Sequence, residues 1–125
     1  MLARFPKARV VLDHMARPEI EAGPPYAEAA GLFALARFPN LHLKLTTHNV
    51  RESRQGKATP ETFFRKVVDA FGAQRIAWGS NYPASSGTLG EILAEARAAL
   101  ASLSVSEQEW IFNRTAQVLY PALAT

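Results

Sequence analysis

The chain contains no cysteine among its 125 residues. This absence excludes a disulfide scaffold, a thiolate nucleophile and any zinc site with cysteine ligands. The sequence also lacks an apolar run long enough to span a bilayer, and its start, MLARFPKARVV, has neither the apolar segment nor the small-residue cleavage site of a secretory signal. We therefore expect a cytoplasmic protein that does not interact with a membrane.

A strong excess of one charge is also missing, because 14 lysines and arginines stand against 11 aspartates and glutamates. The basic residues are scattered, and only the segment RESRQGK (51–57) is locally basic. Such a short run is typical of a solvated loop, although an arginine can also bind a substrate carboxylate through two hydrogen bonds. Since no nucleic-acid-binding motif accompanies it, nucleic acid is not an expected partner.

Three short apolar segments predict β-strands: ARVVLDH (8–14), LHLKLTT (41–47) and RIAWGSN (75–81). Between the first two strands, residues 25–38 carry alanine, leucine and phenylalanine at helical spacings. A helix is also expected over 59–72, since Thr59-Pro60 combines a cap with a first-turn proline and Gly72 ends the pattern. Its apolar stripe consists of Phe63, Phe64, Val67, Val68 and Phe71.

Two further helices are expected after the third strand. Thr88 and Glu91 form a capping-box pattern before LGEILAEARAAL, and Ser104 and Glu107 repeat that pattern before the last helix, which Pro121 ends. The chain therefore alternates predicted strands and helices throughout its length.

The strand ends recur at a constant interval, since His14, Thr47 and Ser80 are separated by 33 residues each time. One strand and one helix in about 30 residues is the repeat of a (βα)₈ barrel, in which about 250 residues form eight units. Strands joined by helices run parallel, so the fold class is α/β: three parallel βα units plus a terminal helix. Ligands in such folds bind at the carboxyl ends of the strands.

Four segments in order resemble one family of enzymes: VVLDHMARP (10–18), LHLKLT (41–46), FGAQRIAWGSNYP (71–83) and WIFNRTAQVLYP (110–121). They are similar to the carboxyl-terminal half of the amidohydrolase-related superfamily of TIM-barrel hydrolases and decarboxylases. Within it, they resemble the branch of dicarboxylate lactonases and sugar lactonases. The resemblance implies that residues 1–125 form a single, partial TIM-barrel domain.

Two departures from this family limit what the resemblance implies. The His-x-His pair of the family's first strand has no counterpart, because the only histidines are His14, His42 and His48. Where the family carries a strand-eight aspartate, which is a base or a metal ligand, this sequence has Asn81. A carboxamide does not take a proton at neutral pH, so Asn81 is expected to orient a water or a substrate carbonyl by hydrogen bonding.

The resemblance implies a site around His14, which matches the family's strand-six histidine, and Asn81; these two are the candidate catalytic residues. Arg17 and Lys44 are candidates for binding a substrate carboxylate. Lys44 is expected on the barrel-interior face of its strand, where a carboxylate from the missing half of the barrel is the alternative partner. Thr46, on the same face as Lys44, and the phenol of Tyr82 complete the candidate substrate-binding set; for Tyr82 the alternative is that it only packs against its loop.

Asp13 is expected to point away from His14, because adjacent residues of a strand face opposite sides of a sheet. Trp78 lies in mid-strand and is expected in the core. No intrinsic metal or other cofactor is expected, since zinc and manganese need three or more protein ligands and His14 and His48 are the two histidine candidates. If the site does take a divalent metal, zinc or manganese, His14 is the expected ligand.

The first class of function that these features favour is a hydrolase that opens a lactone or related ester or amide of a small anionic acid. A decarboxylase of the same superfamily is the enzymatic alternative, and a catalytically inactive half-barrel that acts through association is the non-catalytic one. An adaptor that binds anionic polymers through RESRQGK is a third class. Because three parallel strands leave two unpaired edges, we expect self-association or a missing barrel half as the partner of this chain.

Overall fold

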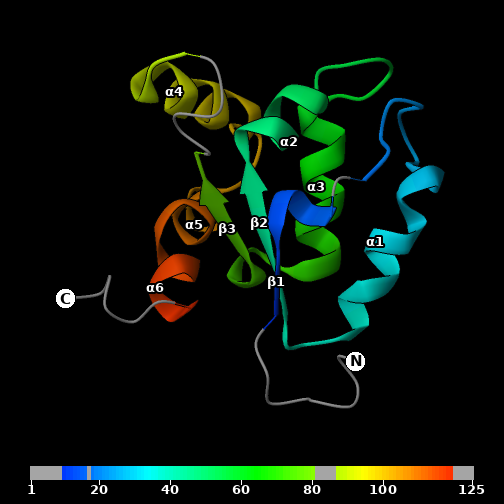
Figure 1. Ribbon diagram of the computed structural model, residues 1–125, viewed down its shortest axis with the longest axis horizontal. Helices are drawn as coiled ribbons and strands as arrows, with labels where there is room; N and C mark the ends of the chain where they lie inside the picture. The colour runs from blue at the N-terminus through cyan, green and yellow to red at the C-terminus, as the bar shows by residue number, and fades with distance from the viewer. Residues whose placement is uncertain (1–9, 17, 81–86, 120–125) are drawn as a thin grey trace.

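The computed structural model describes residues 10–16, 18–80 and 87–119, and its centre is a parallel sheet of three strands (Figure 1). The strands are β1 (Val10–Leu12), β2 (Leu41–Thr46) and β3 (Ile76–Gly79), in the order β1-β2-β3. Val10 pairs with Leu41 and Leu43 pairs with Ile76, so β2 is the central strand. The predicted α/β class with parallel strands is confirmed, although each strand is shorter than its apolar segment.

The remaining elements are short helices around this sheet. In chain order they are η1 (Asp13–Ala16), η2 (Ala27–Ala29), α1 (Ala30–Ala34), η3 (Leu35–Arg37), α2 (Thr47–Glu52), α3 (Pro60–Phe71), η4 (Ala73–Arg75), α4 (Leu89–Ala99), α5 (Val105–Glu109), η5 (Trp110–Arg114) and α6 (Thr115–Leu119). Most η elements are 3₁₀ turns, whereas η5 is a π-helical turn that joins α5 to α6. Within the described part of the chain, no helix is both long and apolar enough to cross a membrane.

The prediction of one helix over 25–38 is wrong in its details, because this segment is divided into η2, α1 and η3. Tyr26 has a left-handed backbone, with φ 62°, directly before η2. Its buried side chain extends to α3, where the phenol oxygen lies 2.7 Å from the hydroxyl of Thr62 and the ring packs on Phe63. Tertiary packing of Tyr26 therefore outweighs the local helical pattern at the start of this segment.

Helix α3 agrees with its sequence pattern at both ends and along its apolar face. The Thr59 hydroxyl accepts a hydrogen bond from the amide of Thr62, and Gly72 follows the last turn with φ 83°, a conformation that glycine adopts at little cost. The predicted apolar stripe is entirely buried: Phe63, Phe64, Val67, Val68 and Phe71. These residues belong to the same buried cluster as the leucines of β2.

The predicted N-caps of α4 and α5 are both present, although only α5 has the complete capping box that was predicted for each. The Thr88 hydroxyl accepts a hydrogen bond from the amide of Glu91 at the start of α4. Ser104 and Glu107 form a complete capping box at the start of α5, with the Glu107 carboxylate accepting from the Ser104 amide. Pro121, which was expected to end the last helix, lies outside the described residues.

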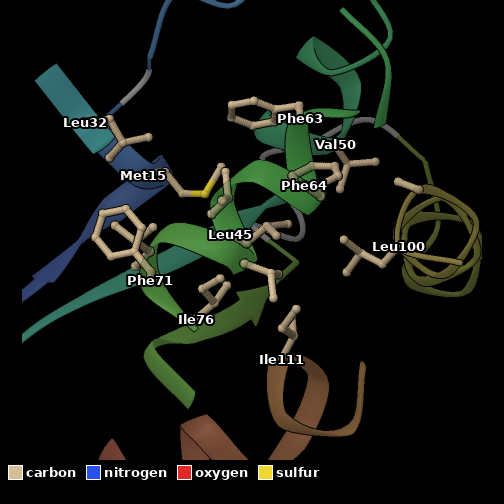
Figure 2. Packing of buried hydrophobic residues seen from close by; sticks show 14 of the residues in the cluster. Met15, Leu32, Leu45, Val50, Phe63, Phe64, Phe71, Ile76, Leu100 and Ile111 are labelled. Atoms are coloured by element: carbon tan, nitrogen blue, oxygen red, sulfur yellow. The ribbon is translucent and has the colours of Figure 1, made fainter. Parts of the chain in front are cut away.

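The hydrophobic core lies between one face of the sheet and these helices. Leu41, Leu43 and Leu45 of β2 point into it and are fully buried, as their alternation with polar residues predicts. Figure 2 shows Leu45 and Ile76 from the sheet in one cluster with Phe64 and Phe71 of α3 and with Leu100 and Ile111. Trp78 packs at the margin of this core, with its ring centroid 5.6 Å from that of Phe112.

Charged side chains tie the covering helices to one another outside the core. Arg65 of α3 donates two hydrogen bonds to the Glu107 carboxylate, at 3.0 and 2.7 Å. These bonds, together with the Ser104 amide, lower the pKa of Glu107 to about 2, and the same pairing raises the pKa of Arg65. Arg75 instead donates to the carbonyls of Phe71, Phe38 and Ala36, and burial lowers its pKa.

Candidate active site

The carboxyl ends of β1 and β2 bring together the polar residues of the candidate site. In Figure 1 the three strand arrows point to the end of the sheet where α2 begins and where the blue turn after β1 lies. That turn is η1, and it contains His14 and Met15 in left-handed conformations, both with φ 52°. His14 therefore follows the strand in a turn and does not end it, which corrects the predicted strand 8–14.

The ring of His14 lies directly beside Thr46, the last residue of β2. Its Nδ1 is 2.6 Å from the Thr46 hydroxyl oxygen, across 32 residues of sequence. The predicted proximity of these two candidates is thus a feature of the structure, and it follows from the parallel pairing of β1 with β2. Thr46 is buried, so its hydroxyl is held in place for this contact.

Asn49 is a residue of this site that the sequence reasoning did not identify. Its buried side-chain amide donates to the carbonyl of His14 at 2.8 Å and accepts from the amide of Thr46 at 2.9 Å. The available signal was the spacing Thr46-x-x-Asn49 at a strand-to-helix boundary, since an amide three residues after a threonine cap can return a hydrogen bond to the cap. Asn49 joins the turn after β1 to the end of β2.

Asp13 lies on the same side as His14, contrary to expectation. One carboxylate oxygen is 3.9 Å from Nε2 of His14, and the other is 3.7 Å from Nζ of Lys44. The prediction failed because it assumed an alternating strand at a position where the chain has already turned into η1. The structure thus groups two carboxylate oxygens, an ammonium and an imidazole at one strand end.

Lys44 projects from the face of β2 opposite the buried leucines, and 46% of its side chain is exposed. Asp13 of the same chain lies within ion-pair distance of Lys44, and the expected alternative partner, a carboxylate from the missing half of the barrel, stays a prediction. The side chain crosses over Gly79 of the neighbouring strand, where an added Cβ would lie 2.6 Å from the Lys44 Cε. Glycine at this position gives the lysine room to lie along the sheet.

A second histidine also approaches the site. The rings of His14 and His48 meet edge to face with their centroids 5.5 Å apart, and Nε2 of His48 lies 2.8 Å from Oε1 of Glu52. Glu52 also lines a pocket of about 310 Å³ together with Pro18, Glu19, Ile20, Glu21 and Glu28. The pocket next to this pair is therefore rich in carboxylates, although the chain as a whole is basic.

The locally basic segment 51–57 does not form a free anion-binding loop at Arg51. This residue belongs to α2 and donates from Nε and Nη2 to the two oxygens of Glu95 in α4, each at 3.1 Å. The pairing raises the pKa of Arg51 and lowers the pKa of Glu95. The carboxylate that Arg51 binds is thus part of the protein.

Three predicted site residues, Arg17, Asn81 and Tyr82, lie outside the described residues. The last described residue before Asn81 is Ser80, and its carbonyl accepts a hydrogen bond of 2.6 Å from the Thr47 hydroxyl. The chain therefore leaves β3 beside the start of α2, at the same end of the sheet as His14.

The described residues do not offer a metal site. Among residues 10–16, 18–80 and 87–119, no group of three or more histidines, aspartates or glutamates is arranged to hold a metal ion. Three protein ligands are the usual minimum for a catalytic zinc. The donor set present here does not fit such an ion.

Comparison with known proteins places this chain in a family. Residues 1–122 match the family model described as amidohydrolase. The chain belongs to the amidohydrolase family. It is also 37% identical over 83 residues to L-fucono-1,5-lactonase of Burkholderia ambifaria. The aligned region covers 66% of this chain and 29% of that protein.

Solved structures support the same conclusion about the fold. An amidohydrolase from Burkholderia multivorans with bound zinc superposes with a TM-score of 0.73 at 24% identity, covering 96% of this chain and 46% of that one. A second crystal form of an amidohydrolase from that organism, with bound HEPES, gives a TM-score of 0.73 at 25% identity, covering 96% and 47%. The chain thus spans less than half the length of these relatives.

Proposed function

We propose that this chain forms the carboxyl-terminal part of a lactone-opening hydrolase, corresponding to the last three βα units of a (βα)₈ barrel. The observation that carries the proposal is the group of His14, Thr46, Lys44 and Asp13 at the carboxyl ends of parallel strands, where enzymes of this architecture bind substrate. The similarity to a fuconolactonase supports lactone opening as the reaction.

In the proposed reaction, water adds to the lactone carbonyl carbon, the ring C–O bond breaks, and a proton from the water ends on the departing ring oxygen, so that the product is a hydroxy acid. His14, together with Asn81, positions the water or polarises the carbonyl, and Thr46 holds the His14 ring. Lys44 is exposed and lies at the same strand end, so its ammonium binds an oxygen of the substrate while Asp13 balances its charge. Arg17 and Tyr82 complete the proposed substrate contacts, as the sequence resemblance implies.

The charge around the site bears on which lactone is bound. A small anionic lactone would contact Lys44 and Arg17 but would meet the four glutamates of the neighbouring pocket. A neutral sugar lactone, such as the substrate named for the relative, would instead donate hydrogen bonds from its hydroxyls to these carboxylates. We therefore test both substrate types, since the proposal of an anionic substrate depends on Lys44 outweighing this acidic pocket.

A divalent metal in the complete site would need ligands beyond those described here. The zinc-bound relative makes zinc a reasonable ion to test, but the described residues do not form a set of three ligands. No step of the proposed reaction therefore depends on a metal held by these residues.

The proposed site also needs a cover. The outer strands β1 and β3 are the two edges of the sheet, and Lys44 is exposed on the face opposite the buried leucines. We propose that a second copy of the chain or the remaining half of a barrel covers this face, since unpaired strand edges favour association. Light scattering on a sizing column tests this proposal, and a strictly monomeric chain would contradict self-association.

The activity test follows acid release from a neutral sugar lactone and from a lactone that carries a carboxylate, each with and without added zinc. We expect hydrolysis of one of them by the associated species and a loss of at least about 100-fold in His14→Ala, the scale for removing one positioned catalytic group. Gln74→Ala is the matched control, because Gln74 is exposed and lies at the amino-terminal end of β3. Equal rates for His14→Ala and the control would overturn the proposed function.

A further inference from the structure

We infer that Asn49 and Thr46 are positioning residues that hold neutral His14 as the Nδ1–H tautomer, so that its Nε2 carries the free lone pair. A neutral imidazole has its proton on one nitrogen only, and the hydrogen bond at one nitrogen decides which one presents a lone pair. The use of this lone pair in lactone opening rests on the proposed function, whereas the tautomer itself follows from the contacts around the ring.

The first step is the orientation of the Asn49 side chain. Its two ends face backbone groups with only one possible role each, because the Thr46 N–H can only donate and the His14 carbonyl can only accept. The atom 2.9 Å from the Thr46 nitrogen must therefore be Oδ1, and the atom 2.8 Å from the His14 oxygen must be Nδ2. A flipped amide would lose both hydrogen bonds inside a buried site.

The second step is the direction of the Thr46 hydroxyl. Its oxygen lies 3.2 Å from Oδ1 of Asn49, and because Oδ1 is only an acceptor, the hydroxyl is the donor in this contact. A hydroxyl has one proton, so in this arrangement Thr46 accepts at its other neighbours, one of which is the backbone amide of Asn49 in the capping box of α2. The other is Nδ1 of His14, 2.6 Å away, so with the Thr46 proton directed at Oδ1 we infer that Nδ1 carries the ring proton and donates it.

The same residues hold the backbone of the turn. His14 and Met15 both have left-handed conformations, which are unfavourable for residues with a side chain. The hydrogen bond from Asn49 to the His14 carbonyl and the complete burial of Met15 keep the turn in this form. Strained backbone of this kind is concentrated at functional sites, where surrounding contacts stabilise it.

The consequence for the site is that Nε2 becomes the accepting nitrogen of His14. This atom lies on the side of Asp13, 3.9 Å from its carboxylate, rather than on the side of the buried Asn49 amide. In the proposed reaction Nε2 accepts a hydrogen bond from the attacking water. An aspartate at position 81 could accept the proton of this water, but the sequence has Asn81 there. Asn49 and Thr46 act on the substrate only through His14.

The test is a long-range proton–nitrogen NMR spectrum of the ¹⁵N-labelled chain at about pH 9, where imidazole is neutral. The His14 signals are assigned with His14→Gln. We expect Nδ1 at a protonated-nitrogen shift and Nε2 at an unprotonated one, and we expect Thr46→Val to move His14 toward the Nε2–H form. Thr46→Ser keeps the hydroxyl and should restore the original pattern.

Thr47→Val is the matched control, because it removes the adjacent buried hydroxyl, which binds the Ser80 carbonyl and not His14. It should leave the His14 pattern unchanged. An Nε2–H tautomer in the parent chain, or no response to Thr46→Val, would overturn the inference. A chain with the expected tautomer that opens no lactone would contradict the proposed function alone, so the two failures are distinguishable.

Discussion

The two faces of the central strand β2 perform different tasks with alternate residues of one short sequence. Leu41, Leu43 and Leu45 are buried under the helices, whereas Lys44, between them, is exposed on the opposite face. The covered face obtains its stability from contacts within the described chain. The open face carries Lys44 of the candidate site, and its cover by a second copy of the chain or by the remaining half of a barrel is a proposal.

The largest expected effect concerns the covered face. Leu43→Ala removes a fully buried side chain from the middle of the core and should lower the free energy of unfolding by about 3 kcal/mol. Urea denaturation with an unchanged slope measures this loss. A loss below 1 kcal/mol, the size expected for a surface substitution, would show that the leucine face is not the structural core.

The ion pair between Arg65 of α3 and Glu107 of α5 should have a smaller, pH-dependent effect on stability. The pKa of Glu107 is lowered from 4.5 to about 2, so its contribution is fully present above pH 4.5 and is lost as the pH falls through about 2. At pH 7, Glu107→Gln should cost about 1 kcal/mol, less than the pKa alone implies, because Arg65 is 41% exposed and solvent screens the pair.

The control for this prediction is Glu109→Gln on the same helix. Glu109 pairs with Arg114 at 3.0 Å, but both side chains are about half exposed. The substitution should change stability by less than about 0.5 kcal/mol at every pH. Thermal unfolding of the two variants is compared between pH 2 and pH 7. The same dependence of the unfolding temperature on pH in both would argue against a stabilising Arg65–Glu107 pair.

Alanine substitutions at two glycines should have opposite effects on stability, because Gly79 lies against the Lys44 side chain and Gly31 has open space around it. Gly79→Ala places a Cβ 2.6 Å from the Lys44 side chain, which must move away from Asp13, and stability should fall by less than about 1 kcal/mol. Gly31→Ala meets nothing within 4 Å on an exposed helix and should raise stability by up to about 1 kcal/mol. Thermal unfolding gives the signs, and the Lys44 Cε NMR signal should respond only to the first change.

The smallest effect on stability is expected on the open face. Lys44→Ala removes an exposed ion pair with a nitrogen–oxygen distance of 3.7 Å and should change the free energy of unfolding by no more than about 0.5 kcal/mol. If the proposed function holds, the same variant should raise the KM for an anionic lactone more than for a neutral one. A destabilisation similar to that of Leu43→Ala would remove the distinction between the two faces.

Patterns in the sequence determined the N-caps of α3, α4 and α5 and the leucine face of β2, because caps and side-chain alternation act over a few residues, and the alternation of strands with helices determined the parallel sheet. The extent of the segment 25–38 was mispredicted, since the distant packing of Tyr26 on α3 decides where that helix begins. The positions of Arg17, Asn81 and Tyr82 stay predictions from sequence.

Tertiary structure decided which side chains gather at the carboxyl ends of β1 and β2. The sequence placed His14 and Thr46 at strand ends, and the parallel pairing of β1 and β2 brings them into contact across 32 residues. The roles of Asp13 and Asn49 depend instead on the left-handed turn at His14, because this turn directs the Asp13 carboxylate toward Lys44 and the His14 carbonyl toward Asn49. The periodicity of a sequence predicts regular strands and helices. It does not predict a turn that is stabilised by hydrogen bonds between residues far apart in the sequence, such as the one at His14.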